Sequence, residues 1–486
     1  MDRKGYLRQI EKVIAQGPYR DSWESLCEHP APDWYQKAKF GIFIHWGVYS
    51  VPEFGSEWYP RHMYKENSRE NRYHVKKYGA LNQFGYKDFI PEFRAENFQA
   101  DEWGELFQVA GARFIVPVGE HHDGFQMYDS GLSRWNAVQM GPKRDILEEL
   151  KEQAGKRGMM FGVSSHRAEH WWFFNHGRLH GDTDVCDPEY QELYGPAAGI
   201  TRDQDSLYDN PPDEAFLEDW LLRTCEMVDR YQPALLYFDW WIQVSAFKPY
   251  LRKFAAYYYN RSYEWGLQTA IAAKFDSYVH KSAVKDVERG KLGGISPDFW
   301  QSDTSTARNS WCYTKDNIYK PAEEILWDLI DVVSKNGALL LNIGPKADGT
   351  IAAEERKILM DIGAWLAING EAVYGTTYWK TYGEGPTQMK EGHFQDQQAP
   401  LFTPEDIRFT AKANYIYAIV MRWPVDGIVR IHSLGRGAGY LVSAIRNIQV
   451  LGQECSPLFE YRGDWLEVTT GLKTLKLPVV LKIEIE

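Results

Sequence analysis

Cysteine is scarce in this chain and is not arranged for bridging. The 486 residues contain five cysteines, and no two of them form a Cys-x-x-Cys pair. An odd number of scattered thiols does not suit a disulfide framework. We therefore expect free thiols in a reducing compartment, at Cys27, Cys186, Cys225, Cys312 and Cys455.

Long apolar runs are missing as well. No stretch approaches the roughly 20 apolar residues that a membrane-spanning helix needs. The first residues, Met1–Tyr6, lead into a charged helical pattern without the apolar segment of a signal peptide. The sequence predicts a cytoplasmic protein that contacts no membrane, and secretion would need a leader that had been removed.

Positive charge is in deficit, with 55 Lys and Arg against 67 Asp and Glu, for a net charge of −12. Proteins that bind nucleic acid normally carry a basic surface, so a nucleic-acid partner is not expected. The chain also lacks a glycine-rich phosphate loop and a Gly-x-Ser-x-Gly elbow. No cofactor is predicted.

Aromatic residues, in contrast, are abundant. The chain has 19 Trp, 30 Tyr and 23 Phe, which make up 15% of its residues. Aromatic platforms recur in proteins that handle glycans, although barrel cores and interfaces use these residues too. The composition favours a carbohydrate ligand without establishing it.

Short apolar runs alternate with amphipathic helical patterns over the first 378 residues. This alternation indicates a parallel α/β fold, and we predict a (β/α)8-like barrel of the TIM type over residues 1–378. The later strands are faint, which leaves an incomplete or distorted barrel open. The clear strand candidates are Phe40–His45, Phe114–Val118, Met159–Ser164, Leu235–Asp239, Leu267–Ala273 and Ala338–Ile343.

The pattern changes after Tyr378. Residues Thr381–Pro404 are rich in Gly, Gln, Pro and charge and are typical of a linker or long loop. Short alternating strands with turn signals follow at regular spacing. We predict a C-terminal antiparallel β-sandwich over residues 379–486.

A carboxylate follows the most apolar of the predicted strands. The run Ala234–Phe238 leads directly into Asp239 and then into Trp240 and Trp241. The C-terminal end of a barrel strand is where this fold keeps its catalytic groups. Asp239 is therefore the first candidate for a catalytic residue, with flanking rings suited to packing against a sugar.

Three other strands also end in polar and aromatic residues, which a core would not tolerate without partners. Their convergence at one end of the barrel predicts the mouth of a pocket. For the adjacent pair His121 and His122 we expect one ring to face the pocket and the other to brace it. The segments concerned are His45–Trp46 with Glu57–Trp58, Glu120–Phe125, and His166–Trp171.

A catalytic metal is the minority interpretation of these histidines. Zinc hydrolases built on barrels usually need two or more imidazoles on one face together with a carboxylate. The first two strands supply one histidine and an adjacent pair, with no His-x-His. A metal-dependent barrel hydrolase stays as an alternative that chelation would test.

Cleavage of a glycosidic bond needs a second carboxyl group beside Asp239. Glu288, in the segment Asp286–Gly290 after a predicted strand, is the natural candidate. A surface ion pair with Arg289 explains this glutamate equally well at this point.

Several separated blocks resemble glycoside hydrolase family 29, the retaining α-L-fucosidases, from Trp34 to about Tyr378. The resemblance implies a (β/α)8-like barrel followed by a β-sandwich, and a fucosylated oligosaccharide or glycoconjugate as substrate. It implies no cofactor. The blocks are Lys39–Gly47, Glu57–Tyr59, Glu120–Phe125 and Leu340–Thr350.

Position by position, the resemblance implies that Asp239 is the nucleophile and Glu288 the acid/base. Tyr237 takes the aromatic position two residues before the nucleophile, and Lys274 takes a basic position on the fifth strand. The implied ligands of the sugar hydroxyls are His45, Trp58, His121 and His122.

Two departures from the family pattern concern the substrate contacts. Many members have Trp-Glu where this chain has Trp300-Gln301. The chain has no carboxylate at the second of these positions, so the acid cannot come from there. Trp300 itself is expected to contact the substrate. The third strand has Ser164-Ser165-His166 where many relatives have tyrosines. We expect His166 or Trp171 to replace a tyrosine contact.

The preferred linkage is expected to depend on the loops 176–211 and 381–404. Transfer of fucose to other sugars and a homo-oligomeric state are further expectations that the residues leave open. The non-enzymatic alternative is a fucose-binding protein on an inactive barrel, which the presence of both Asp239 and Glu288 disfavours.

Overall fold

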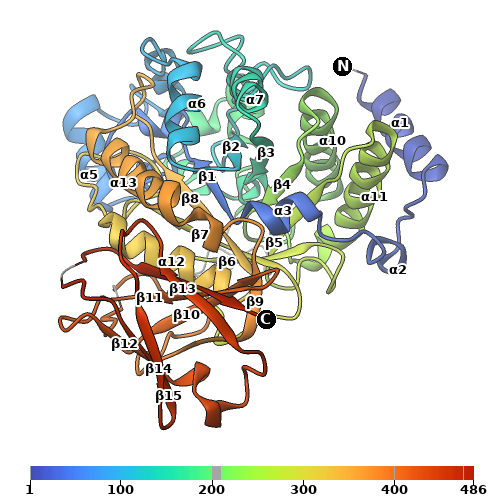
Figure 1. The fold of residues 1–486 in the computed structure, drawn as a ribbon. Helices are drawn as coiled ribbons and strands as arrows, with labels where there is room; N and C mark the ends of the chain where they lie inside the picture. Colours follow the sequence, from blue (N-terminus) through green and yellow to red (C-terminus); the bar gives the residue numbers. More distant parts are fainter. Residues whose placement is uncertain (1, 200–209, 399, 474) are drawn as a thin grey trace.

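The computed structural model describes residues 2–199, 210–398, 400–473 and 475–486. Eight parallel strands close into a barrel, and two antiparallel sheets formed by the C-terminal residues lie beside it (Figure 1). The predicted fold class is confirmed. Part of the predicted specificity loop 176–211, residues 200–209, lies outside the described residues.

The barrel strands follow one another in chain order, and β8 closes the barrel by pairing in parallel with β1. Nearly every residue of these strands is buried, as expected when helices or other segments cover a parallel sheet. The strands are β1 (Phe40–Ile44), β2 (Phe114–Glu120), β3 (Met160–Ser165), β4 (Leu235–Phe238), β5 (Ala270–Lys274), β6 (Val284–Glu288), β7 (Trp300–Ser305) and β8 (Gly337–Ile343).

Strands β6 and β7 close the part of the barrel that the apolar pattern left open. Their sequences, Val-Lys-Asp-Val-Glu and Trp-Gln-Ser-Asp-Thr-Ser, carry no apolar run. They form strands because each has backbone hydrogen bonds to a neighbouring strand on both sides. Their polar side chains make hydrogen bonds inside the barrel. Gln301, for example, donates from Nε2 to Asp286 Oδ2 at 2.7 Å and accepts from Tyr35.

Helices cover most of the outer wall of the barrel. Residues 275–283 and 289–299, all of which the structure describes, form no helix, so no helix follows β5 or β6 before the next strand. The long helices are α1 (Arg3–Gln16), α5 (Arg69–Tyr78), α6 (Ala100–Val109), α7 (Ile146–Lys156), α10 (Glu214–Tyr231), α11 (Lys248–Trp265), α12 (Ala322–Ser334) and α13 (Ala353–Asn369).

Short helices occupy the ends and loops of the barrel. Helix α3 (Asp33–Ala38) precedes β1, and its Tyr35 fills the N-terminal end of the barrel interior against Phe114 and Phe299. The other short helices lie in the loops; they are α2 (Trp23–Leu26), α4 (Tyr59–His62), α8 (Asn175–Arg178) and α9 (Gln191–Tyr194).

The C-terminal sheets face each other across one apolar core, as in a sandwich. One has the order β13-β16-β11-β10-β9 and the other β12-β15-β14, and all their pairs are antiparallel. Their strands are β9 (Thr377–Glu384), β10 (Ile407–Lys412), β11 (Tyr415–Val420), β12 (Ile428–Ile431), β13 (Ile445–Val450), β14 (Leu458–Arg462), β15 (Trp465–Thr469) and β16 (Val479–Ile485).

Helix α12 joins the sandwich to the barrel (Figure 1). Asp331 of α12 accepts from Arg408 Nε of β10 at 2.8 Å and from Lys335 Nζ at 2.7 Å, and all three side chains are buried. The indole N–H of Trp327 donates to the carbonyl oxygen of Met421. A buried ion network of this kind holds only one relative position of the two parts, because a displaced charge would lose its partners.

The predicted linker Thr381–Pro404 is partly wrong, because its first residues belong to β9. Farther along, the segment 392–395 returns to the barrel and pairs with the end of β6 and the residues after it. The amide of Phe394 donates to the carbonyl oxygen of Glu288 at 2.9 Å, and that of Gln395 donates to the carbonyl of Arg289 at 2.8 Å. The residues between the two folds therefore become part of the barrel mouth.

Among the described residues, no helix has the length and apolar character needed to cross a membrane.

Candidate active site

The strand ends surround a cavity of about 210 Å³, comparable in size with a single sugar ring and its substituents. It opens at the C-terminal end of the barrel, as the polar strand ends predicted. The lining residues are Phe43, His45, Glu57, Trp58, His121, His122, His166, Glu169, Tyr237, Asp239, Trp240, Lys274, Glu288, Trp311 and Phe394.

Asp239 is the first residue after β4, and both of its carboxylate oxygens are engaged. Oδ1 lies 3.1 Å from the Lys274 ammonium, and Oδ2 accepts from His166 Nδ1 at 2.8 Å. Burial alone would raise the pKa of Asp239, but the Lys274 charge and the His166 contact outweigh it and hold this pKa well below its usual value. Asp239 is therefore ionised at neutral pH and fixed in orientation.

His166 holds Asp239 from the neighbouring strand. A carboxylate can only accept, so Nδ1 of His166 carries the hydrogen, while Nε2 pairs with Ser164 Oγ at 2.9 Å. Of the two residues expected to take the place of a tyrosine, His166 lies in the cavity wall and contacts the carboxylate of Asp239.

Lys274, the last residue of β5, links the two predicted catalytic carboxyl groups. Its ammonium contacts Asp239 and Glu288 and lies 3.8 Å from Asp303. Burial would lower the pKa of this lysine, but the three acids raise it well above its ordinary value. Since one nitrogen reaches both carboxyl groups at about 3 Å each, the oxygens facing it are at most about 6 Å apart.

Glu288 is the last residue of β6, and its side chain is 8% exposed. Its carboxyl group accepts from Lys274 and from the indole N–H of Trp240. Burial raises the pKa of Glu288 to about 7; the ammonium of Lys274 opposes this rise, and the charges of Asp303 and Asp239 add to it. The two carboxyl groups on Lys274 therefore differ in protonation near neutral pH.

The alternative of a surface ion pair between Glu288 and Arg289 is wrong. Arg289 is buried and points away from the cavity, where its guanidinium donates to Asp396 and to the carbonyls of Ala307 and Ser310. Arg289 follows β6 with a positive φ of 44°, and its side chain lies in the loop behind the strand while the acid faces the cavity.

His121 and His122 both line the cavity, so neither ring serves only as a brace behind the other. They follow the last residue of β2 and so escape the alternation of a strand; their ring centroids are 4.1 Å apart. His122 Nδ1 donates to the carbonyl of His166, which leaves Nε2 as an acceptor 3.7 Å from Asp239. Burial lowers the pKa of His122 to about 4.

His45 completes this polar wall. The amide nitrogen of Asn342 donates to the carbonyl of Trp311, so its oxygen faces His45 Nδ1 at 2.7 Å and that nitrogen carries the hydrogen. Burial lowers the pKa values of His45 and His121 well below the usual value. Neutral imidazoles both donate and accept hydrogen bonds, which suits sugar hydroxyls.

Three imidazoles meet in the cavity although the sequence has no His-x-His motif on these strands. Ligand atoms of His45, His121 and His166 lie within 4.8 Å of one another because three different strands each deliver one ring. However, both nitrogens of His166 already have partners in Asp239 and Ser164. A metal would displace one of them, so the donor set fits hydroxyl groups better than a cation.

Two of the predicted substrate contacts are wrong. Trp171 ends a 3-10 turn that carries its ring away from the cavity, where its N–H donates to the carbonyl of Asn210. Trp300 is the first residue of β7 and so lies at the opposite end of the barrel, with its N–H on the carbonyl of Lys335. The other predicted residues line the cavity together, namely His45, Trp58, His121, His122, His166, Tyr237, Asp239, Lys274 and Glu288.

Sequence reasoning missed several residues of the cavity wall. Glu57 precedes the predicted Trp58, and its carboxylate accepts from the Trp311 amide at 3.0 Å. Glu169 lies within the polar segment His166–Trp171, which gave a signal that was not used. Trp311 and Phe394 come from a loop and from the predicted linker, where no strand end marked them.

Glu169 is a further buried carboxyl group in this cavity, beside those of Asp239, Glu288 and Glu57. Among the described residues its Oε2 has no hydrogen-bond partner, and it lies 3.8 Å from His122 Nε2. Burial, with a further contribution from the charge of Asp239, raises the pKa of Glu169 well above its usual value. Glu169 therefore keeps its proton to a higher pH than an exposed glutamate does, and in that form it can donate into the cavity.

The sequence model of the family described as alpha-L-fucosidase matches residues 6–371, about three quarters of the chain. The chain belongs to the α-L-fucosidase family. It is 30% identical over 436 residues to the tissue α-L-fucosidase of Rattus norvegicus, covering 86% of this chain and 82% of that one. It is 31% identical to the plasma enzyme of Homo sapiens, covering 84% of this chain and 79% of that one.

The fold of this fucosidase-family protein is similar to solved fucosidase structures. The α-fucosidase of Thermotoga maritima in complex with fucose has a TM-score of 0.74 and 29% identity, covering 96% of this chain and all of that one. A structure of the same enzyme with a mechanism-based inhibitor has a TM-score of 0.75 at the same identity and coverage.

The protonation of Glu169 gives a prediction about stability. In Glu169→Gln the amide imitates the neutral acid. In the wild type, the unfolded carboxyl ionises as pH rises above 4.5, its ordinary pKa, while the folded one stays protonated up to its raised pKa. The contribution of this carboxyl group therefore lowers the free energy of unfolding of the wild type as pH rises over this range. The amide of the variant does not titrate and makes no such contribution.

Urea unfolding of both proteins at pH 5 and pH 8 measures this difference. We expect the variant to gain stability relative to the wild type at pH 8. A variant that loses more stability at pH 8 than at pH 5 would mean that Glu169 is ionised in the folded protein.

Proposed function

We propose that this protein is a retaining α-L-fucosidase that releases terminal α-L-fucose from oligosaccharides or glycoconjugates. The observation that carries the proposal is the pair of carboxyl groups, those of Asp239 and Glu288, that contact the one buried ammonium of Lys274. Their oxygens lie within about 6 Å, which suits the separation of about 5–5.5 Å in retaining enzymes rather than the wider spacing of inverting ones.

In the first step Asp239 attacks the anomeric carbon of the fucosyl unit. Glu288 gives its proton to the glycosidic oxygen as the bond to that oxygen breaks, and the aglycone leaves as an alcohol. Lys274 and His166 keep Asp239 ionised and aimed, since both contact its carboxylate directly.

In the second step water opens the ester between fucose and Asp239. Once Asp239 is esterified, its negative charge no longer raises the pKa of Glu288, while Lys274 still lowers it. Glu288 is then ionised and takes a proton from the attacking water, and fucose leaves with its original configuration. One residue thus serves as acid and then as base.

The remaining cavity residues hold the sugar. His45, His121 and His122 face it as neutral hydrogen-bonding groups, and Glu169 adds a donor. The rings of Phe43, Trp58 and Trp311 supply an apolar wall for the C6 methyl group of fucose. L-galactose differs from L-fucose at this wall by one hydroxyl group, and another 6-deoxy sugar presents the same methyl group, so the wall separates either from fucose only weakly.

The nucleophile is tested with Asp239→Gly. The variant should lose nearly all activity on an aryl α-L-fucoside, because no covalent intermediate can form. Azide should restore turnover by entering the space left by the carboxylate. Asp276→Gly, an exposed change two residues beyond Lys274, is the matched control and should keep wild-type activity.

Wild-type-like turnover by Asp239→Gly would overturn the assignment. Loss of activity without rescue by azide or formate, in a variant with an unchanged thermal midpoint, would also contradict a nucleophilic role.

The acid is tested through the pH dependence of kcat/KM. Glu288 must be protonated in the free enzyme, so kcat/KM should fall as pH rises through about 7, its raised pKa. Asp239 must be ionised, and its pKa lies well below 3.8, so its protonation should cause no loss above that pH.

Glu288→Gln, measured with an aryl fucoside that needs little acid assistance, should lack the decline near pH 7. A decline that persists in this variant would assign the titration to another group.

A further inference from the structure

Three aromatic rings form an apolar surface at the mouth of the cavity, which we call the aromatic ledge: Trp240, Phe275 and Phe394. The ring of Trp240 lies 5.2 Å from that of Phe275 and stacks at 6.0 Å and 15° on that of Phe394. Trp240 and Phe394 also line the cavity, so the ledge begins where the sugar site ends.

Two rings of the ledge are exposed to solvent. Phe275 is 58% exposed and Phe394 is 50% exposed. Both also have positive φ values, 51° and 57°, which are unfavourable for residues with side chains. Exposed apolar patches and backbone strain beside an active site are typical of ligand contacts.

The ledge lies on the side of the cavity that holds Glu288. Trp240 donates its indole N–H to the carboxyl group of Glu288, and the backbone amide of Phe394 donates to the Glu288 carbonyl. The acid must reach the glycosidic oxygen, so the group beyond that oxygen leaves the cavity past Glu288 and over these rings.

The ledge carries no charge of its own. Its neighbour His393 stacks on Phe275 at 5.3 Å and 11°, and burial and the nearby Lys274 lower the pKa of His393 to about 4. A neutral ring surface is suited to the C–H face of a pyranose, as aromatic side chains offer large flat apolar areas.

We propose that the aromatic ledge binds the sugar that carries the fucose, a neutral pyranose with one apolar face such as a hexose or N-acetylhexosamine. The inference rests on the proposed fucosidase activity and adds the aglycone class. It assigns part of the specificity to the segment 392–395, which lies between the two folds.

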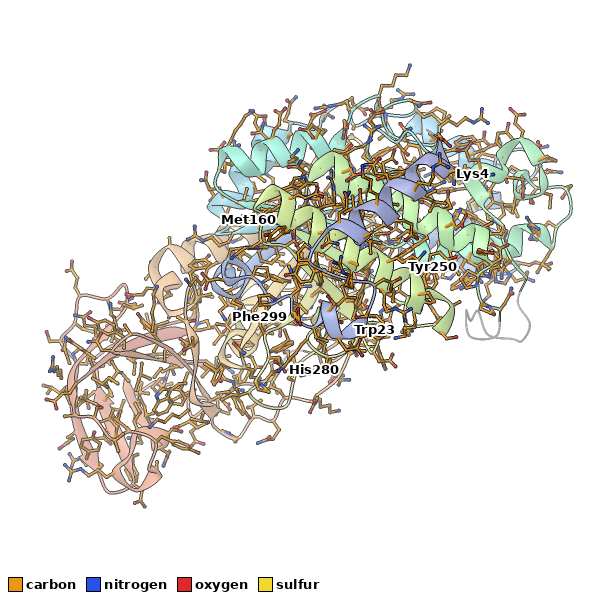
Figure 2. All side chains as sticks on the ribbon, turned by 90° about the vertical axis from the view of Figure 1, so that its right-hand side faces the viewer. Lys4, Trp23, Met160, Tyr250, His280 and Phe299 are labelled. Carbon is orange, nitrogen blue, oxygen red and sulfur yellow. The ribbon has the colours of Figure 1, made fainter. Side chains whose placement is uncertain are left out.

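Space beyond the ledge is open for a longer glycan. Phe275 and His393 line a groove of about 840 Å³ together with residues of β5, β6 and the helix-free loops beside these strands. Farther along, the groove is lined by His280 and Phe299, which Figure 2 labels on this face of the molecule. A sugar on the ledge can therefore carry further units without meeting the barrel wall.

The test compares a substrate without an aglycone sugar with one that has it. The enzymes are the wild type, Phe275→Ala, Phe394→Ala and the double variant. Tyr263→Ala, which removes an aromatic ring that is 71% exposed on α11, is the matched control. The substrates are α-L-fucosyl fluoride and the fucosyl-galactose or fucosyl-N-acetylglucosamine disaccharide that the wild type cleaves fastest.

On the disaccharide, kcat/KM should fall about threefold to tenfold for each single variant and further for the double variant, as expected for the loss of aromatic contacts. On fucosyl fluoride all enzymes should agree within about twofold, and Tyr263→Ala should match the wild type on both substrates.

Equal losses on both substrates, no loss on the disaccharide, or a wild type that cleaves the fluoride but no disaccharide would each overturn the ledge as an aglycone site. A wild type that cleaves neither substrate would instead contradict the proposed fucosidase activity.

Discussion

A single buried ammonium, that of Lys274, organises the active end of this barrel. It contacts the carboxyl groups of Asp239 and Glu288 together and is itself surrounded by acids. Its charge lowers the pKa of both carboxyl groups, so the difference between them comes from their other neighbours. Asp239 has the additional hydrogen bond from His166 and is ionised, whereas burial and the neighbouring acids keep Glu288 protonated up to about pH 7. A nucleophile and an acid are thereby distinguished by their surroundings alone.

The rest of the fold serves to bring these three side chains together. Asp239 directly follows β4, and Lys274 and Glu288 end β5 and β6. These three strands are adjacent in the barrel, so strand spacing sets the separation of the three side chains. Asp303 of β7 binds the Tyr237 hydroxyl at 2.6 Å and so anchors the polar interior behind them. Interior groups of this kind need partners, and the barrel provides them from facing strands.

This arrangement also explains what could be read from the sequence. The apolar strand before Asp239 and the polar ends of the first three strands predicted the barrel and most of the cavity wall. Strands β6 and β7 gave no apolar signal because they carry the polar interior, so the sequence places Glu288 only in a segment after a predicted strand, although it ends a strand of its own. Trp300 and Trp171 were misplaced because aromatic identity says nothing of barrel end or turn direction. Phe394 needed tertiary pairing to β6, which no local pattern shows.

The catalytic account depends most on which carboxyl group bonds to the sugar. Incubation with 2-deoxy-2-fluoro-α-L-fucosyl fluoride, whose fluorine slows hydrolysis of the intermediate, followed by peptide mass spectrometry, reads this directly. The account predicts one fucosyl adduct per chain, on Asp239. An adduct on Glu169 or Glu288, or turnover to fucose of inverted configuration with no adduct, would contradict it.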